Sequence, residues 1–256
     1  MYLGLDIGSS SSKAVVLDKN GNIAGESVIN IGTGSRGPQV VIEEALGKAN
    51  VTKEQIKKTV VTGYGRMTFK DADKQVTEIS CHAKGVTRIL PETRTIIDIG
   101  GQDAKVIKVD SSSNVKNFVM NEKCAAGTGR FLEVMARVLD TTIGELSDMA
   151  AKGADGVSIS STCTVFAESE MISQLAAGKK VEDVALGAHK SIAQRVAGLA
   201  NRIGITPTVV MSGGVALNSS VIKAVEEEID FKIARLKSPQ TMGALGAAVY
   251  AMEIDI

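Results

Sequence analysis

The sequence predicts an α/β protein built of two duplicated lobes, and three observations lead to this prediction. An apolar strand that ends in Asp-x-Gly and leads through a polar turn to a lysine occurs twice, as Asp6-Ile7-Gly8 with Lys13 and as Asp98-Ile99-Gly100 with Lys105. The residues after each lysine are again strand-forming, so both turns join strand to strand. Segments with helical periodicity follow each copy. A single repeat at so long a spacing indicates two similar units rather than a solenoid.

The first copy is expected to begin with an antiparallel meander. After the hairpin, the turn Lys19-Asn20-Gly21-Asn22 leads to a third strand at 23–29. A glycine-rich loop at 32–37 precedes a helix that Pro38 starts and that ends near residue 49. A short strand at 59–62, a tight turn at 63–66 and a helix from about 73 to 90 complete this copy.

The second copy repeats the plan with a longer helical section. Strands are expected at 95–99, 104–109 and 115–119, and helices at about 128–139, 143–151, 165–176 and 181–203. A strand at 208–211 then leads through Ser212-Gly213-Gly214-Val215 into another helix, and the last helix spans 242–252. We expect residues 1–93, together with 242–256, to form the first lobe and residues 94–241 the second, with a nucleotide cleft between them.

Composition agrees with a compact enzyme. Hydrophobic residues make up 44% of the 256 residues, which is enough for one large core or two small ones. Lys plus Arg and Asp plus Glu number 29 each, aromatic residues are 3%, and Trp is absent, so no nucleic-acid partner is expected. The chain begins directly with a strand, and its longest uncharged stretch, 206–222, contains Pro and Gly. We therefore expect a cytoplasmic protein without a signal peptide or membrane span.

The two turns have the chemistry of phosphate sites. Gly8, Gly100 and Gly101 allow tight turns whose N–H groups face an anion. Hydroxyl groups of Ser9 and Ser10 add donors. Lys13 and Lys105 are candidates to reach phosphate, although a solvated lysine at a strand end is an equally good interpretation of each. Oxygen ligands for Mg²⁺, directly or through water, are available from the carboxylates of the two copies, namely Asp6, Asp98 and Asp103. One Asp-x-Gly alone usually marks a simple turn, but two in register favour a nucleotide.

Two familiar nucleotide motifs are excluded by local sequence. Lys13 is preceded by Ser12 and followed by Ala14, whereas a P-loop needs Gly before the lysine, Ser or Thr after it, and a helix. A Rossmann turn also opens a helix, so the strand pattern after Lys13 counts against a dinucleotide-binding fold as well. Gly213, Gly214 and Val215 lie between a strand and a helix, so they are a candidate contact for adenosine, although a glycine needed only for packing is an equally good interpretation of this motif alone.

Several motifs resemble known ATPases. The Asp-x-Gly and Gly-Gly motifs resemble those of the actin-like superfamily of sugar kinases, Hsp70 and actin, which implies the ribonuclease H-like, actin-like ATPase fold. Three longer segments resemble the ATP-dependent activators of 2-hydroxyacyl-CoA dehydratases, also called archerases, which are of the BadF/BadG/BcrA/BcrD type: Asp98-Ile99-Gly100-Gly101-Gln102-Asp103, Asn121-Glu122-Lys123-Cys124-Ala125-Ala126-Gly127-Thr128-Gly129-Arg130-Phe131 and Ser160-Ser161-Thr162-Cys163-Thr164-Val165-Phe166-Ala167-Glu168-Ser169-Glu170.

The resemblance implies a homodimer with one [4Fe–4S] cluster at its interface, bound by Cys124 and Cys163 of each chain. The chain has three cysteines, so one chain cannot supply the four thiolates of a cubane, whereas two chains can. Spacing alone would not reveal this site, because cysteine is most often a small buried hydrophobe. Both residues precede predicted helices, whose N-termini favour thiolate. Cys81 is expected to lie in the core. His82 and His189 are expected to be packed or solvated histidines on helices, because neither has a second histidine or a carboxylate at ligand spacing.

The implied activity is ATP hydrolysis coupled to transfer of one low-potential electron. Asp6, Gln102 and Asp103 are the candidate catalytic residues. ATP or ADP with Mg²⁺ would change the angle between the lobes. The expected acceptor is an iron–sulfur dehydratase, or alternatively a double-cubane-cluster protein or a benzoyl-CoA reductase-type partner, and the expected donor is ferredoxin or flavodoxin. A small-molecule kinase of the same fold, or a nucleotide-dependent scaffold without redox chemistry, remain as alternatives.

Overall fold

The computed structural model describes residues 1–34, 36–160 and 163–255. By its internal contacts the chain divides into two compact units. Unit 1 comprises Met1–Ile96, Val109–Lys116 and Leu236–Ile256, and unit 2 comprises Ile97–Lys108 and Asn117–Arg235. Within the described residues, no helix is both long and apolar enough to cross a membrane.

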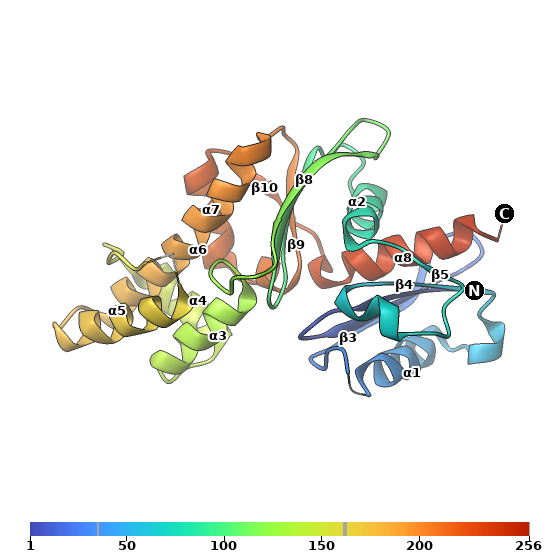
Figure 1. The fold of residues 1–256 in the computed structure, drawn as a ribbon, viewed down its shortest axis with the longest axis horizontal. Coiled ribbons are helices and arrows are strands. Elements are labelled where there is room, and N and C mark those ends of the chain that lie inside the picture. The colour runs from blue at the N-terminus through green and yellow to red at the C-terminus, as the bar shows by residue number, and fades with distance from the viewer. Residues whose placement is uncertain (35, 161–162, 256) are drawn as a thin grey trace. The chain divides into compact units, whose positions relative to one another are not determined.

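Unit 1 is a five-stranded sheet with helices on both faces (Figure 1). The strand order is β3-β2-β1-β4-β5, in which β1 pairs antiparallel with β2 and parallel with β4. Helix α1 contacts β2 and β3, and α8 contacts β1, β2 and β4. The bounds are β1 Tyr2–Ile7, β2 Ser12–Leu17, β3 Ile23–Ile29, α1 Gly37–Ala49, β4 Lys58–Thr62, β5 Lys74–Gln75, α2 Glu78–Ile89 and α8 Met242–Glu253.

Alternation along β1 decides which helix covers which face. Leu3, Leu5 and Ile7 point into the core shared with α1. The residues between them point to the other face, where a Cβ on Gly4 would lie 2.1 Å from the Ala244 carbonyl oxygen of α8. Only glycine allows α8 this close to the sheet. Asp6, two residues farther along β1, is therefore on the α8 face.

Unit 2 repeats the strand order of unit 1. Its sheet is β10-β9-β6-β7-β8, which read from β8 is the same arrangement as β3-β2-β1-β4-β5. Helices α3 to α7 and this sheet share the larger core. The bounds are β6 Thr95–Ile99, β7 Ala104–Val109, β8 Val115–Asn121, α3 Gly129–Val138, α4 Ile143–Lys152, α5 Thr164–Ala176, α6 Val181–Ile203, β9 Val209–Ser212, α7 Ser219–Ile229 and β10 Ile233–Ala234.

The duplication extends to single hydrogen bonds. After β2, the Asp18 carboxylate accepts the N–H groups of Asn20 and Asn22 at 2.8 and 2.9 Å. After β7, the Asp110 carboxylate accepts those of Ser112 and Asn114, both at 2.9 Å. Backbone donors at Asn22 and Asn114 are the largest influence that holds the pKa of the two carboxyls below their usual range. The repeat inferred from the sequence is therefore present in the fold.

The helix expected at 73–90 is shorter than its sequence suggested. Residues 74–75 form β5 beside β4, and α2 begins at Glu78, where Thr77 caps it by accepting the Ser80 N–H. The capping threonine competes with a longer helix because its side chain replaces a backbone partner. Strands β5 and β10 have two residues each, too few to show a period in the sequence.

Candidate functional site

The first turn (residues 8–11) places a buried carboxylate beside a lysine. Gly8 N–H donates to the Ser11 carbonyl at 3.0 Å and closes the turn between β1 and β2. Asp6 and Lys13 are register partners on these strands, and Lys13 Nζ lies 3.2 Å from Asp6 Oδ2. Ser9 lies in the turn next to Ser10, whose buried hydroxyl has no hydrogen-bond partner in the part of the chain that the structure describes. A buried hydroxyl in that state fits a site that a polar ligand completes.

At the second turn (residues 100–103), one lysine forms ion pairs with two carboxylates. Gly100 N–H donates to the Asp103 carbonyl at 2.9 Å. The buried Lys105 Nζ lies 2.6 Å from Asp103 Oδ2 and 3.3 Å from Asp98 Oδ2. Asp98 also accepts a 2.8 Å hydrogen bond from the Ser212 hydroxyl. Gln102 is exposed and Gly101 is half-buried. Asp98 is thus fixed by its neighbours, while Asp103 and Gln102 are at the surface of the turn.

A glycine with positive φ follows the neighbouring strand in each unit. Gly63 after β4 has φ 93°, and Gly213 after β9 has φ 86°. A Cβ on Gly63 would lie 2.5 Å from Asp6 Oδ1, and one on Gly213 would lie 3.1 Å from Asp98 Oδ1. Sequence reasoning identified Gly213 but not its counterpart. The signal was present, because a strand ending in a hydroxyl residue and then glycine occurs as Thr62-Gly63 and Ser212-Gly213.

The Gly213-Gly214 segment does not open an α-helix directly. Residues Gly214–Leu217, which include Val215, form a 3₁₀ turn, and α7 begins at Ser219. Asn218 caps α7 by accepting the Val221 N–H at 2.9 Å. The Asn218 side chain also lies 3.2 Å from His189 Nε2, and His189 is buried. Of the two expected states, packed or solvated, His189 is therefore packed. Burial lowers the pKa of His189.

Helices α2 and α8 bring two further residues to Asp6. A Cβ on Gly243 of α8 would lie 3.0 Å from Asp6 Oδ2 and 2.9 Å from His82 Nε2. His82 is buried on α2. Sequence reasoning assigned His82 no role beyond that of a packed or solvated histidine, because nothing local shows that α2 and α8 converge on the end of β1. Their contact depends on the tertiary fold.

The two candidate cluster cysteines lie just before two helices that contact each other. Cys124 precedes α3, and its carbonyl accepts a 2.9 Å hydrogen bond from Asn121 Nδ2. Cys163 is the residue before α5, and its carbonyl accepts the Ala167 N–H at 3.0 Å. Helices α3 and α5 pack together. Both thiols are free and half-buried. Ser161 and Thr162, which belong to the third resemblance motif, lie outside the described residues.

Cys81 differs from the other two cysteines. It is fully buried on α2, and burial raises the pKa of its thiol to about 12. The expectation of a core cysteine is confirmed. Among the described residues of this single chain, no three His, Cys, Asp or Glu side chains are grouped to hold a metal ion.

Comparison with known proteins identifies the family. Residues 3–251 match the model of the BadF/BadG/BcrA/BcrD ATPase family. The chain belongs to this family. Its members include relatives of similar length: the chain is 54% identical to the 2-hydroxyisocaproyl-CoA dehydratase activator of Clostridioides difficile over 99% of this chain and 96% of that protein. It is 50% identical to the (R)-2-hydroxyglutaryl-CoA dehydratase activating ATPase of Acidaminococcus fermentans over 97% and 96% of the two chains.

Comparison with solved structures confirms the expected fold. The Clostridium difficile activator of 2-hydroxyisocaproyl-CoA dehydratase, solved with bound ADPNP, superimposes with a TM-score of 0.96 over 99% of this chain and 95% of that one, at 54% identity. A ROK family glucokinase from Streptomyces griseus has a TM-score of 0.59 over 98% of this chain and 99% of that one, at 13% identity. That likeness shows the shared actin-like fold alone.

Proposed function

We propose that this protein is an ATP-hydrolysing activator of a 2-hydroxyacyl-CoA dehydratase. The observation that carries the proposal is the 54% identity, over nearly the whole length of both proteins, to an activator of 2-hydroxyisocaproyl-CoA dehydratase. The two carboxylate–lysine turns support it, since they are suited to a nucleotide triphosphate and its metal ion.

ATP binds at the two turns. The N–H groups of Gly8, Gly100 and Gly101, the hydroxyls of Ser9 and Ser10 and the Lys13 ammonium bind its phosphate oxygens. Gly213, Gly214 and Val215 contact the adenosine. The hydroxyl of Ser10, which lacks a partner within the described part of the chain, is satisfied by phosphate.

Asp6 and Asp103 would offer carboxylate oxygens to Mg²⁺, directly or through water. Asp98 acts indirectly, because it and Asp103 share Lys105 and so fix the second turn. Gln102 and Asp103 orient the water that attacks the γ-phosphorus. The bond from that phosphorus to the ADP oxygen then breaks, and ADP and phosphate leave.

Cys124 and Cys163 fit one [4Fe–4S] cluster shared by two copies of the chain. They are free, half-buried thiols placed before two helices in contact, and two per chain give the four thiolates of a cubane. On α5, the helix that Cys163 precedes, Val165, Phe166 and Ile172 expose 66%, 64% and 53% of their surface. A second copy would cover this apolar surface. When bound, the cluster supplies a low-potential carrier of one electron.

The electron is proposed to come from ferredoxin or flavodoxin and to pass to an iron–sulfur dehydratase in the cytoplasm. A second acceptor class is favoured by one observation, a 29% identity to a component of the benzoyl-CoA reductase of Thauera aromatica, over 96% of this chain. A double-cubane-cluster protein remains a third acceptor. A sugar kinase function has only the fold likeness behind it.

One anaerobic experiment tests the proposal. The protein is purified without oxygen, its iron is counted, and it is reduced with dithionite and desalted. We expect about four irons per two chains. We also expect oxidation of the reduced protein, followed by its visible spectrum, when ATP and purified C. difficile 2-hydroxyisocaproyl-CoA dehydratase are both present. ATP hydrolysis without iron, or oxidation that is independent of ATP, would contradict the proposal.

A further inference from the structure

Three hydrogen bonds and a close contact anchor the chain that leads to Cys163. Val157 N–H donates to the Asp183 carbonyl of α6 at 3.2 Å. Ile159 is buried in the core of unit 2 and packs beside Gly187, where a Cβ would lie 3.1 Å from it. The Ser160 carbonyl accepts a 3.3 Å hydrogen bond from the Ser191 hydroxyl of α6. The segment from 157 to 160 is thus fixed along α6.

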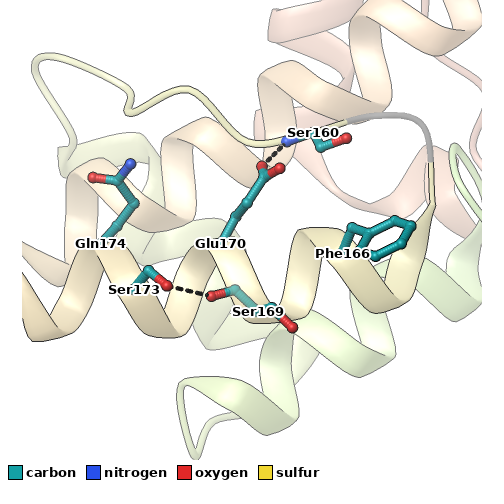
Figure 2. A pocket seen from close by; sticks show the side chains of 6 residues that line it. All are labelled: Ser160, Phe166, Ser169, Glu170, Ser173 and Gln174. Carbon is teal, nitrogen blue, oxygen red and sulfur yellow. Dashed lines mark hydrogen bonds between the residues drawn. The ribbon is translucent and has the colours of Figure 1, made fainter.

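The remaining bond comes from the helix that Cys163 precedes. Glu170, two turns into α5, accepts the backbone N–H of Ser160 on its carboxylate Oε2 (Figure 2). In Figure 2 the Glu170 side chain points from α5 toward Ser160. Both residues line a hollow of about 530 Å³. Ser160 is therefore fixed from two sides, by α6 through its carbonyl and by α5 through its N–H.

Ser160 lies close in the sequence to the Cys163 thiol. Cys163 is three residues after Ser160, and its carbonyl is already part of α5 through the bond from Ala167. Glu170, on the helix that Cys163 precedes, therefore holds the backbone of a residue three positions before Cys163. A charged acceptor makes this a strong backbone hydrogen bond. Groups that hold a ligand's backbone in place support metal binding without touching the metal.

We infer that Glu170 is a positioning residue for Cys163. This inference rests on the cluster proposed above. The Glu170 carboxylate holds Ser160 in place. Ser160, three residues before Cys163, in turn sets the direction from which the Cys163 thiol approaches a ligand.

Matched variants separate this role from a general effect of charge. Glu170→Ala removes the acceptor, whereas Glu170→Gln keeps an oxygen that accepts the Ser160 N–H. Glu168→Gln is the control, since it removes a carboxylate from the same helix turn and, among the described residues, Glu168 has no bond to Ser160. Two readouts are measured: the rate at which bathophenanthroline removes iron, and the rate at which iodoacetamide alkylates Cys163 and Cys124 in the iron-free protein.

We expect iron loss from Glu170→Ala to be about tenfold faster or more, as for other residues that support a metal ligand. In the iron-free variant, alkylation of Cys163 should change relative to Cys124, because only Cys163 loses its anchor. Glu170→Gln and Glu168→Gln should match the wild type in both readouts.

Two results would overturn the inference. One is a Glu170→Ala variant with the wild-type rates of iron loss and Cys163 alkylation. The other is equal acceleration of alkylation at Cys124 and Cys163, which would show general loosening of unit 2. Absence of iron from the wild type would defeat the cluster proposal instead, and the alkylation ratio would still test whether Glu170 positions Cys163.

Discussion

The backbone N–H of Arg130 donates a 2.7 Å hydrogen bond to the carbonyl of Gly101. Beside it, Gly129 N–H donates to the Gly100 carbonyl at 2.8 Å. Two N–H groups in the first turn of α3, which have no partner within the helix, therefore donate hydrogen bonds to the second turn. Because Cys124 lies just before this helix, the proposed phosphate turn and the proposed cluster ligand share a continuous path within unit 2. We propose that nucleotide state reaches the cluster along this path.

Removal of the Arg130 N–H should uncouple the two sites. Proline is tolerated in the first turn of a helix, so Arg130→Pro removes this donor with little harm to α3. We expect the variant to hydrolyse ATP and retain iron, but to lose the effect of nucleotide on the rate of iron chelation. Arg130→Ala keeps the N–H and removes only the ion pair to Glu133, which is exposed. A nucleotide effect that persists in Arg130→Pro would exclude this path.

Replacement of Gly243 should impair nucleotide hydrolysis. The Cβ of Gly243→Ala would lie 3.0 Å from Asp6 Oδ2 and 2.9 Å from His82 Nε2, so the carboxylate must move. Because small displacements of a catalytic group are costly, kcat/KM for ATP should fall by up to about 100-fold. Iron content should stay unchanged, since Cys124 and Cys163 are in unit 2.

A second glycine of unit 1 serves as the control for Gly243→Ala. A Cβ on Gly47, in the exposed face of α1, would meet nothing within 4 Å. Gly47→Ala should leave ATPase activity as it is and stabilise the protein by about 0.5–1 kcal/mol, because alanine suits a helix interior better than glycine. Equal ATPase activity in the two variants would show that Asp6 does not need its present position.

Lys105 should matter more for stability than Lys13. The Lys105 side chain is 3% exposed and forms ion pairs with Asp98 and Asp103. The Lys13 side chain is 15% exposed and forms an ion pair with Asp6 alone among these carboxylates. Loss of one partner from a buried ion pair destabilises a protein by about 3–5 kcal/mol, so Lys105→Ala should approach that range and Lys13→Ala should fall below it. Urea unfolding measures both. Adding Asp98→Asn to Lys105→Ala should recover part of the loss, and a further loss of stability would contradict the assignment of these charges.

Cys81 should be the unreactive thiol. With a pKa raised to about 12 by burial, it stays protonated at pH 8. Iodoacetamide should therefore modify two thiols per native, iron-free chain and all three after unfolding. In the unfolded chain the Cys81 thiol has its ordinary pKa of 9.0, whereas in the folded chain its pKa is about 12. The folded state therefore loses the stability that Cys81 contributes as the pH rises from 9.0 towards 12. Rapid alkylation of native Cys81 would show that α2 opens readily.

Local patterns in the sequence were enough to predict the duplication, because Asp-x-Gly, the turn and the lysine are contiguous in each copy. The meander, α6 and the strands β6 and β7 were predicted with their bounds nearly right. Contacts between distant segments could not be predicted in this way. Gly243 and His82 reach Asp6 only because α8 packs on the β1 face, and Glu170 reaches Ser160 only because α5 folds back beside α6. No periodicity encodes either contact.

The central claim is that nucleotide at the turns controls a cluster held by Cys124 and Cys163. The most direct measurement is the rate at which bathophenanthroline removes iron from the anaerobic protein without nucleotide, with ADP and with a non-hydrolysable ATP analogue, each with Mg²⁺. We predict that the three rates differ and that the ATP analogue gives the fastest, because the electron must leave for a docked partner in that state. By linkage, reduction of the cluster must then change the affinity for nucleotide. Equal rates in all three states, with nucleotide binding demonstrated in the same samples, would contradict the claim.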